Sequence, residues 1–225
     1  MFNFNEEKVR FEITDTLSLR HEIEKAADEI HKNGYDNLFL LGIGGTYAAA
    51  MELEAFMRGN SRINVYLENA ADLLVLGNTG LTEKSVVITT SATGNTPEVV
   101  KAVQAVKDKG ALVVGFIDEE DSPLYAMSDI KFCRKGSAYF KMLLFALRLM
   151  YLAGDYPEYE EFYDSVRHLP DGLVQVQKQI DDRALEYARK YQDAPLHYFI
   201  GAGNLWGAAY SFAMCYMEEM HWLHT

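Results

Sequence analysis

The stretch that most constrains the fold runs from Val86 to Glu98, because it combines a strand, a turn and the start of a helix. Its first residues, Val86-Val87-Ile88, are β-branched and apolar, as in strands that are covered on both faces. Thr96-Pro97-Glu98 offers a capping hydroxyl, a proline at the first helical position and an acid in the first turn. The sequence therefore predicts a strand, a loop and a helix in direct succession.

Three hydroxyl side chains and one glycine occupy the loop between that strand and that helix. Ser91, Thr93 and Thr96 alternate with residues that turn the chain, so their oxygens and the free amides of the next helix can converge on one anion. A small phosphorylated metabolite is the ligand class that such a loop fits. Serine and threonine are also common helix caps, and a capped helix that binds nothing is the alternative.

The charge of the chain limits its partners. Its 225 residues include 21 Lys and Arg against 33 Asp and Glu, a net charge of −12, and the hydroxyl loop has no basic residue. A nucleic-acid partner is not expected, because the surfaces that bind nucleic acids are basic. Backbone dipoles and hydroxyl groups can still hold a phosphate at contact distance.

The composition is that of a globular protein, which we expect in the cytoplasm and without a membrane partner. Hydrophobic residues make up 49% of the chain, enough for a core. No window reaches the roughly 18 uninterrupted apolar residues of a membrane span, and residues 1–7 lack the features of a signal peptide. Cys133 and Cys215 lack metal-ligand spacing, so we expect both to be buried as small apolar side chains. Neither a metal nor a cofactor is expected.

Strands alternate with helices over most of the chain. Strands are predicted at 38–41, 63–67, 86–88, 112–117 and 130–133, and helices at 17–33, 48–57, 70–76, 96–109, 123–127 and 138–152. This order predicts an α/β fold in which helices cover both faces of a five-stranded parallel sheet, a three-layer sandwich. In such folds ligands bind at the carboxyl ends of the strands, where the hydroxyl loop falls.

The pattern divides the chain into four parts. We predict an N-terminal arm at 1–14, a first domain at 15–154, a helical linker at 155–194 and the start of a second domain at 195–225. The second domain is expected to open with a strand at 195–200. A unit of this kind needs about five strands, so we expect this chain to be part of something longer.

An internal repeat supports the second domain. Gly201-Ala202-Gly203 can be laid on Gly42-Ile43-Gly44, and Trp206 then falls on Tyr47, with small residues following in a helix each time. The first of these turns also fits the start of a dinucleotide-binding fingerprint, with Glu68 as the ribose-binding acid. Tyr47 takes the place of the third glycine, however, and would crowd the helix against the strand, so this alternative is the weaker one.

Together these motifs resemble the sugar isomerase (SIS) domain family. The order and spacing of Ser91-x-Thr93-Gly94-x-Thr96, of Gly44-Gly45-Thr46 and of Gly201-x-Gly203-Asn204 are similar to those of the family. The resemblance extends from about residue 15 to the end, and it implies a flavodoxin-like SIS sandwich, two such domains in the enzymes, and a sugar 6-phosphate as ligand. It also implies a substrate site made of Gly45, Thr46, Ser91, Thr93, Asn95, Thr96 and Ser137.

Residues 217–224 resemble the catalytic helix of the glucosamine-6-phosphate synthase isomerase domain and, more closely, that of fructosamine-6-phosphate deglycases. The resemblance implies that Glu219 is the general acid/base, which moves a proton between carbon and oxygen. Spacing alone would make Glu218-Glu219 a solvated helix face. Helical spacing puts four residues on the side of Glu219: Phe212, Cys215, Tyr216 and Leu223. We therefore expect a partly desolvated carboxylate.

The histidines near the end of the sequence are not expected to bind a metal. His221 and His224 are three residues apart and have no third ligand in view. The resemblance implies a ring-opening histidine that would lie beyond Thr225, so this chain is expected to hold only part of an active site.

Three functions are open at this point. The first is a deglycase that cleaves a 6-phosphorylated ketosamine, such as fructoselysine 6-phosphate, to glucose 6-phosphate and an amine or amino acid. The second is an aldose–ketose phosphosugar isomerase, or an isomerase of the glucosamine-6-phosphate synthase type. The third is a non-catalytic phosphosugar sensor. A sensor is expected to carry a DNA-binding helix pair, and a synthase a glutamine-hydrolysing domain, before the first SIS domain; residues 1–14 hold neither, which favours the deglycase.

The aromatic and methionine-rich end of the sequence predicts a protein partner. Residues 212–222 are more apolar than an exposed helix tolerates. We expect either further parts of the second domain or another copy of the chain to cover them, the latter in a homodimer or higher homo-oligomer.

Overall fold

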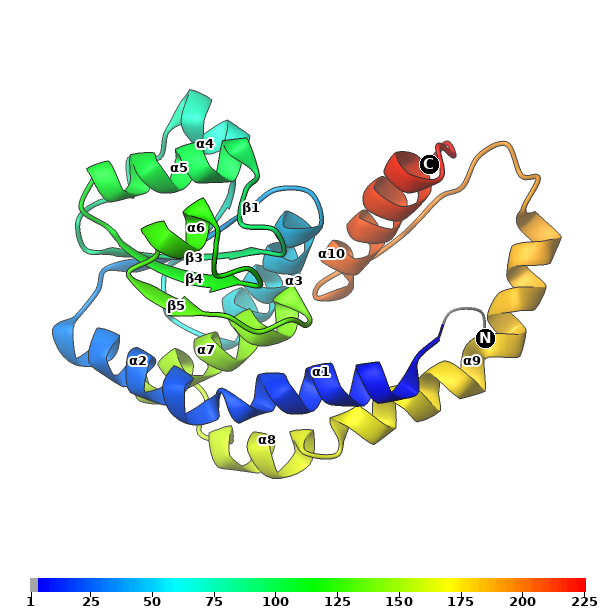
Figure 1. Cartoon of the computed structure of the whole chain (residues 1–225), viewed down its shortest axis with the longest axis horizontal. Coiled ribbons are helices and arrows are strands. Elements are labelled where there is room, and N and C mark those ends of the chain that lie inside the picture. The colour runs from blue at the N-terminus through cyan, green and yellow to red at the C-terminus, as the bar shows by residue number, and fades with distance from the viewer. Residues whose placement is uncertain (1–3) are drawn as a thin grey trace.

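The computed structural model describes residues 4–225, and its centre is a five-stranded parallel sheet with the strand order β2-β1-β3-β4-β5 (Figure 1). Every neighbouring pair of strands is parallel. The strands are β1 (Asn37–Gly42), β2 (Val65–Asn69), β3 (Ser85–Ser91), β4 (Leu112–Ile117) and β5 (Ile130–Phe132). The predicted α/β fold with a parallel sheet is therefore confirmed.

Helices cover both faces of this sheet, which completes the predicted three-layer sandwich. Successive residues of β1 point to opposite faces, so that Leu38 and Leu40 enter one core while Phe39 and Leu41 enter the other. The face of Phe39 is covered by α4 (Ala70–Leu76), α5 (Pro97–Asp108) and α6 (Pro123–Met127). The face of Leu38 is covered by α2 (Arg20–Asn33), α3 (Gly45–Asn60) and α7 (Ala138–Leu152).

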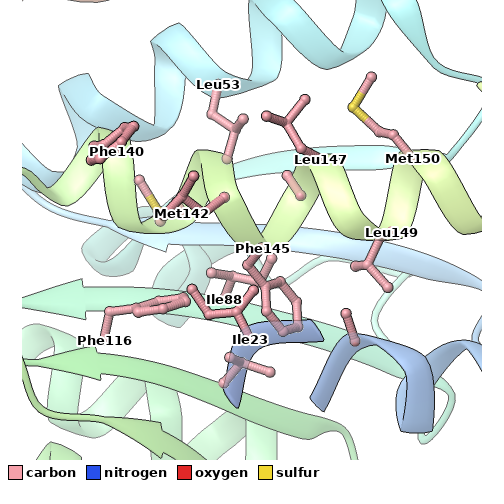
Figure 2. Packing of buried hydrophobic residues seen from close by; sticks show 14 of the residues in the cluster. Ile23, Leu53, Ile88, Phe116, Phe140, Met142, Phe145, Leu147, Leu149 and Met150 are labelled. Atoms are coloured by element: carbon pink, nitrogen blue, oxygen red, sulfur yellow. The ribbon is translucent and has the colours of Figure 1, made fainter. Parts of the chain in front are cut away.

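The larger core lies between the sheet and α7. Phe116 of β4 stacks on Phe132 of β5 with ring centroids 4.8 Å apart, and Phe145 of α7 meets Phe116 edge-on at 6.1 Å. Figure 2 shows side chains of α2 and α3, among them Ile23 and Leu53, gathered around the same helix. This core anchors α7, and therefore its first turn, against the carboxyl half of the sheet.

The N-terminal region is helical rather than an arm. Residues 6–14, predicted to belong to an arm, form most of α1, and residues 1–3 lie outside the described part of the chain. Helix α1 packs along α9, where Arg10 Nε bonds Asp171 Oδ1 at 2.7 Å. The chain turns at the buried Leu19, so the helix predicted from residue 17 begins as α2 at residue 20. The helices outside the sandwich are α1 (Glu6–Ser18), α8 (Tyr159–Val166) and α9 (Leu169–Tyr191).

The prediction of a strand at 195–200 is wrong. These residues have no regular structure, and Tyr198 and Ile200 are exposed by 82% and 96%. A strand needs a neighbour for its backbone groups, and one bond links this segment to the end of the chain, from His197 N to His224 O at 3.1 Å. The repeat continues as helix α10 (Leu205–Tyr210) and the π-helix η1 (Ser211–Met220).

The two cysteines, Cys133 and Cys215, are each half-buried, so the expectation that both are buried is wrong.

Within residues 4–225, no helix combines the length and the apolar character that crossing a bilayer requires.

The link between α7 and β2 gives a test of stability. The Asp155 carboxylate accepts bonds from Arg62 N at 2.8 Å, Arg62 Nε at 2.7 Å and Ser61 Oγ at 2.9 Å, and the Arg62 amide is the main cause of its lowered pKa. We expect Asp155→Asn to lower the free energy of unfolding by about 1–3 kcal/mol at pH 7. A lowered pKa stabilises the fold above the unfolded value of about 3.9, and this stabilisation is lost as the pH falls through the folded value.

Urea unfolding of both proteins at a series of pH values measures this difference. The gap between them should close in acid. The exposed Asp36, replaced by Asn, is the matched control and should leave the unfolding curve almost unchanged. A gap that stays constant down to pH 2 would show that the charge of Asp155 is not what stabilises this link.

Candidate functional site

The candidate site lies where the strand order of the sheet reverses. β1 has β2 on one side and β3 on the other, and helices α3 and α5, which follow β1 and β3, lie on opposite faces of the sheet. The connections after β1 and β3 therefore diverge over the carboxyl edge, which is the position at which open α/β sheets bind ligands. The glycine turn 42–46 and the hydroxyl loop 91–96 are these two connections.

The hydroxyl loop is ordered by bonds within itself. Ser91 Oγ accepts a bond from the Gly94 amide at 2.9 Å, and Asn95 Nδ2 donates to the Thr93 carbonyl at 2.7 Å. Thr96 is the N-cap residue of α5, but its hydroxyl makes no capping bond. The expected cap is therefore absent, which leaves this hydroxyl and the first amides of α5 uncommitted within the helix.

The connection from β4 to α6 supports the hydroxyl loop. The Asp118 amide donates to Ser91 O at 3.0 Å, and the Leu124 amide donates to Gly94 O at 3.2 Å. Gly94 has φ +65°, and a Cβ built there would lie 2.1 Å from Ser122 Oγ. Only glycine fits this position, because both the backbone conformation and the space exclude a side chain.

The glycine turn after β1 is equally tight. Gly44 has φ +54°, and a Cβ on Gly42 would lie 2.7 Å from the Tyr47 amide nitrogen. Thr46 Oγ1 donates to Ile43 O at 2.9 Å and accepts from Ile43 N at 3.1 Å. The Thr46 hydroxyl therefore closes the turn at the start of α3.

The residues of the expected substrate site differ in exposure. Ser91 is buried, Thr46 and Thr96 are half-buried, and Gly45, Thr93, Asn95 and Ser137 are exposed. The neighbouring positions of β1 and β3 bring Thr46 and the hydroxyl loop to one edge of the sheet. Ser137 instead follows β5 in the chain and is the N-cap residue of α7. Its hydroxyl accepts a hydrogen bond from Phe140 N at 3.3 Å.

One buried ion pair at the carboxyl edge of the sheet was not predicted from the sequence. Lys141 of α7 is 2% exposed, and its Nζ bonds Asp118 Oδ1 at 2.5 Å and Arg134 O at 2.9 Å. The available signal was Lys141 itself, one of two cations with Arg148 inside the apolar run 138–152, since a buried charge requires a partner. Desolvation raises the pKa of Asp118, and Lys141 opposes that shift.

The internal repeat extends to backbone geometry. Gly203 has φ +56°, like its counterpart Gly44, and the Leu205 amide bonds Ala202 O at 3.2 Å just as the Thr46 amide bonds Ile43 O at 3.2 Å. α3 has 16 residues, and its counterpart is formed by the 6 residues of α10 followed by the 10 of η1. Leu205 stands where Thr46 stands in the first copy, so the second turn lacks the hydroxyl.

The two repeated helices pack against each other in reciprocal fashion. Tyr47 meets Tyr210 edge-on at 6.4 Å, while their counterparts Trp206 and Met51 line one hollow of about 310 Å³. This is the pattern of a local two-fold axis between antiparallel helices. A Cβ on Gly207 would lie 2.4 Å from Ala48 O, so the helices touch at the backbone.

Glu219 is exposed near the end of η1, contrary to the expected partly desolvated setting. Its carboxylate lies close enough to Cys215 to contribute to the raised pKa of that thiol, of which burial is the main cause. The adjacent Glu218 is half-buried, and its Oε1 accepts from Thr225 N at 3.2 Å and from Thr225 Oγ1 at 2.8 Å. The two acids therefore differ in environment.

Other hollows lie away from this edge. A hollow of about 440 Å³ at the amino ends of β3, β4 and β5 is lined by Ser85, Leu112 and Ile130, and it is remote in the fold from both loops. In the part of the chain that the structure describes, no three His, Cys, Asp or Glu side chains cluster so as to hold a metal.

Fold and site together define a doubly wound α/β protein with a hydroxyl-bearing loop at its topological switch point. The profile of the SIS domain family matches residues 33–155, more than half of the sequence, and the chain belongs to that family. The resemblance inferred from the three motifs is thereby confirmed.

Relatives of this chain include two deglycases. It is 26% identical over 220 residues to fructosamine deglycase FrlB of Bacillus subtilis (strain 168), covering 93% of this chain and 67% of that protein. It is 20% identical over 240 residues to fructoselysine 6-phosphate deglycase of Escherichia coli (strain K12), covering 100% and 70%. The chain thus spans about two thirds of the length of these relatives.

A solved structure shares the fold. It belongs to a candidate phosphosugar isomerase from Bacillus subtilis, with a TM-score of 0.85 and 23% identity, and the match covers 94% of this chain and 67% of that one.

The close contact at Gly94 generates a prediction. We expect Gly94→Ala to lower the free energy of unfolding by about 2–5 kcal/mol, because the new Cβ both strains a positive φ and strikes Ser122. Gly154→Ala is the matched control, since Gly154 also has a positive φ but open space around it, and we expect a loss of about 1–2 kcal/mol. Urea denaturation of the two variants measures the difference. Equal losses would mean that the Ser122 contact relaxes without cost.

The backbone contact between Gly207 and Ala48 generates a further prediction. Gly207→Ala should loosen α10 from α3, even though alanine favours a helix by about 1 kcal/mol over glycine. Gly172→Ala in α9, where nothing lies within 4 Å of the new Cβ, should instead stabilise the protein. Limited proteolysis in the segment 192–204 and hydrogen exchange of α10 report the loosening. Unchanged exchange in the Gly207 variant would contradict the predicted contact.

Proposed function

We propose that this chain is the phosphosugar-binding part of a deglycase that cleaves a 6-phosphorylated ketosamine to glucose 6-phosphate and an amine or amino acid. The observation that carries the proposal is the meeting of the hydroxyl loop 91–96 with the turn of Thr46 at the switch point of the sheet. The names of the two related deglycases support the choice of substrate class.

The phosphate is proposed to lie over the start of α5. The Thr96 hydroxyl and the first amides of α5 have no capping partner, and the helix dipole favours a negative group at this end. Thr93 and Asn95 are exposed beside them. Gly45 and Thr46 approach from the neighbouring connection, and Ser137 is proposed to contact the sugar rather than the phosphate.

The chemistry requires one group that accepts and returns a proton. A base removes a proton from C1 of the ketosamine to give an enolamine, and a proton is then delivered to C2, which leaves an imine at C1. Water adds to that imine, and the amine and glucose 6-phosphate separate. Glu219 is the proposed acid/base, on the resemblance of residues 217–224 to the deglycase helix.

Glu218 is a second candidate for that role on a specific observation. It is the more buried of the two acids and already accepts two bonds from Thr225, whereas Glu219 is exposed. Bonds of this kind fix the orientation of a carboxylate, and a general acid/base must be held in place beside the proton that it moves. The experiment must therefore compare both acids.

Release of glucose 6-phosphate tests the proposal. A coupled assay would follow its release from 6-phosphofructosyl-lysine and 6-phosphofructosyl-aspartate, using the complete protein that contains this chain. We expect release by the parent and a loss of about 100-fold or more in Glu219→Gln, or in Glu218→Gln if that residue is the acid/base. Glu22→Gln, on the exposed face of α2, is the matched control and should retain full activity.

Two other outcomes would redirect the assignment. If neither ketosamine is cleaved while fructose 6-phosphate raises the melting temperature, the result would support the phosphosugar site and contradict the deglycase activity. Interconversion of fructose 6-phosphate and glucose 6-phosphate would then identify an isomerase, and its absence a sensor.

The proposal includes a partner for the C-terminal face. Trp206, Phe212, Tyr216, Met220 and Trp222 are each exposed by half or more. A face this apolar is proposed to be covered, either by further parts of a second SIS domain or by another copy in a homo-oligomer. We also propose that the protein lies in the cytoplasm.

A further inference from the structure

A buried ion pair connects the two sides of the candidate site. Lys141 Nζ lies 2.5 Å from Asp118 Oδ1 and donates to Arg134 O at 2.9 Å. The lysine is 2% exposed and the aspartate 15%. Apolar residues of α7 surround the lysine in sequence, and replacing a buried pair by apolar groups is often neutral for stability. The fold alone therefore does not require a charge at this position.

The Asp118 end of the pair supports the hydroxyl loop. Asp118 follows β4, and its amide donates to Ser91 O at 3.0 Å. Further along the same connection, the Leu124 amide holds Gly94 O at 3.2 Å and Ser122 fills the space against Gly94. The connection that begins with Asp118 therefore supports the hydroxyl loop at both Ser91 and Gly94.

The Lys141 end of the pair supports Ser137. Arg134, whose carbonyl accepts from Lys141, lies in the connection that leads from β5 to Ser137. The Lys141 amide bonds Ser137 O at 3.1 Å, in the first turn of α7. One ammonium group thus holds both the connection before Ser137 and, through Asp118, the loop that carries the other hydroxyls.

We propose that Lys141 and Asp118 are positioning residues, which set the separation between the hydroxyl loop and Ser137 and so select phosphorylated ligands long enough to reach both. This inference rests on the proposed phosphosugar site and extends it. A ligand that spans both sides depends on the separation, whereas a bare phosphate on the hydroxyl loop does not. Neither side chain is proposed to touch a reacting atom.

The test removes both charges and compares two probes. In the double variant Asp118→Asn/Lys141→Met, we expect the dissociation constant of fructose 6-phosphate to rise by about 10-fold or more, since small displacements of binding groups are costly. The dissociation constant of inorganic phosphate should stay within about twofold. Calorimetry measures the first and phosphorus NMR titration the second. The double variant is used because Lys141→Met alone would leave Asp118 buried without its partner.

A lysine–aspartate pair that is about one third exposed provides the control. Lys107 Nζ bonds Asp129 Oδ1 at 2.5 Å at the opposite edge of the sheet. Lys107→Met/Asp129→Asn should leave both dissociation constants unchanged, whatever it does to the melting temperature.

The outcomes separate the two proposals. Equal weakening of both probes, or no weakening of either, would overturn the positioning role while leaving the phosphosugar site in place. A parent protein that binds neither probe would overturn the proposed function itself.

Discussion

Helices α3 and α5 leave neighbouring strands toward opposite faces of the sheet, and the candidate site depends on that divergence. β1 and β3 pair directly, yet α3 packs in the core that contains Ile88 and α5 in the core that contains Val87. Each connection must turn sharply over one edge, and each does so on a glycine with positive φ, at Gly44 and Gly94. The placement of the candidate site thus follows from the order of the strands. The hydroxyl groups decide what it can hold.

The sheet could be predicted because its strands carry their own signal. Short apolar runs such as 38–41 and 112–117, each followed by a turn and a helix, are typical of a parallel sheet covered on both faces. Helix α1 could not be predicted in this way, since it packs on α9 and its bond between Arg10 and Asp171 spans 161 positions. The segment 195–200 shows the opposite error. Its composition suits a strand, but a strand also requires a neighbouring backbone.

The site was predictable where its residues are contiguous and not where they meet through the fold. The hydroxyl loop is one stretch of sequence, whereas Lys141 and Asp118 are 23 positions apart and pair because α7 packs against β3 and β4. The surroundings of Glu219 were predicted with the spacing of an α-helix. η1 is a π-helix, whose bonds run from i to i+5, so neighbours on one face fall four to five positions apart. Cys215, one of the four residues expected beside Glu219, is four positions away and lies near it, yet Glu219 is exposed rather than enclosed.

The two copies of the turn-helix unit share the geometry of the turn but not its chemistry. Leu205 replaces Thr46, so the second turn keeps the bend and loses the hydroxyl, while Glu218-Glu219 at the end of the second helix correspond to the uncharged Gly59-Asn60 of α3. Because the helices are antiparallel, η1 continues past the first turn of α3, toward the edge that bears Thr46. Under the proposed function the first copy holds the phosphate and the second supplies the acid. The contact at Gly207 then sets their relative placement, since no larger residue fits against α3.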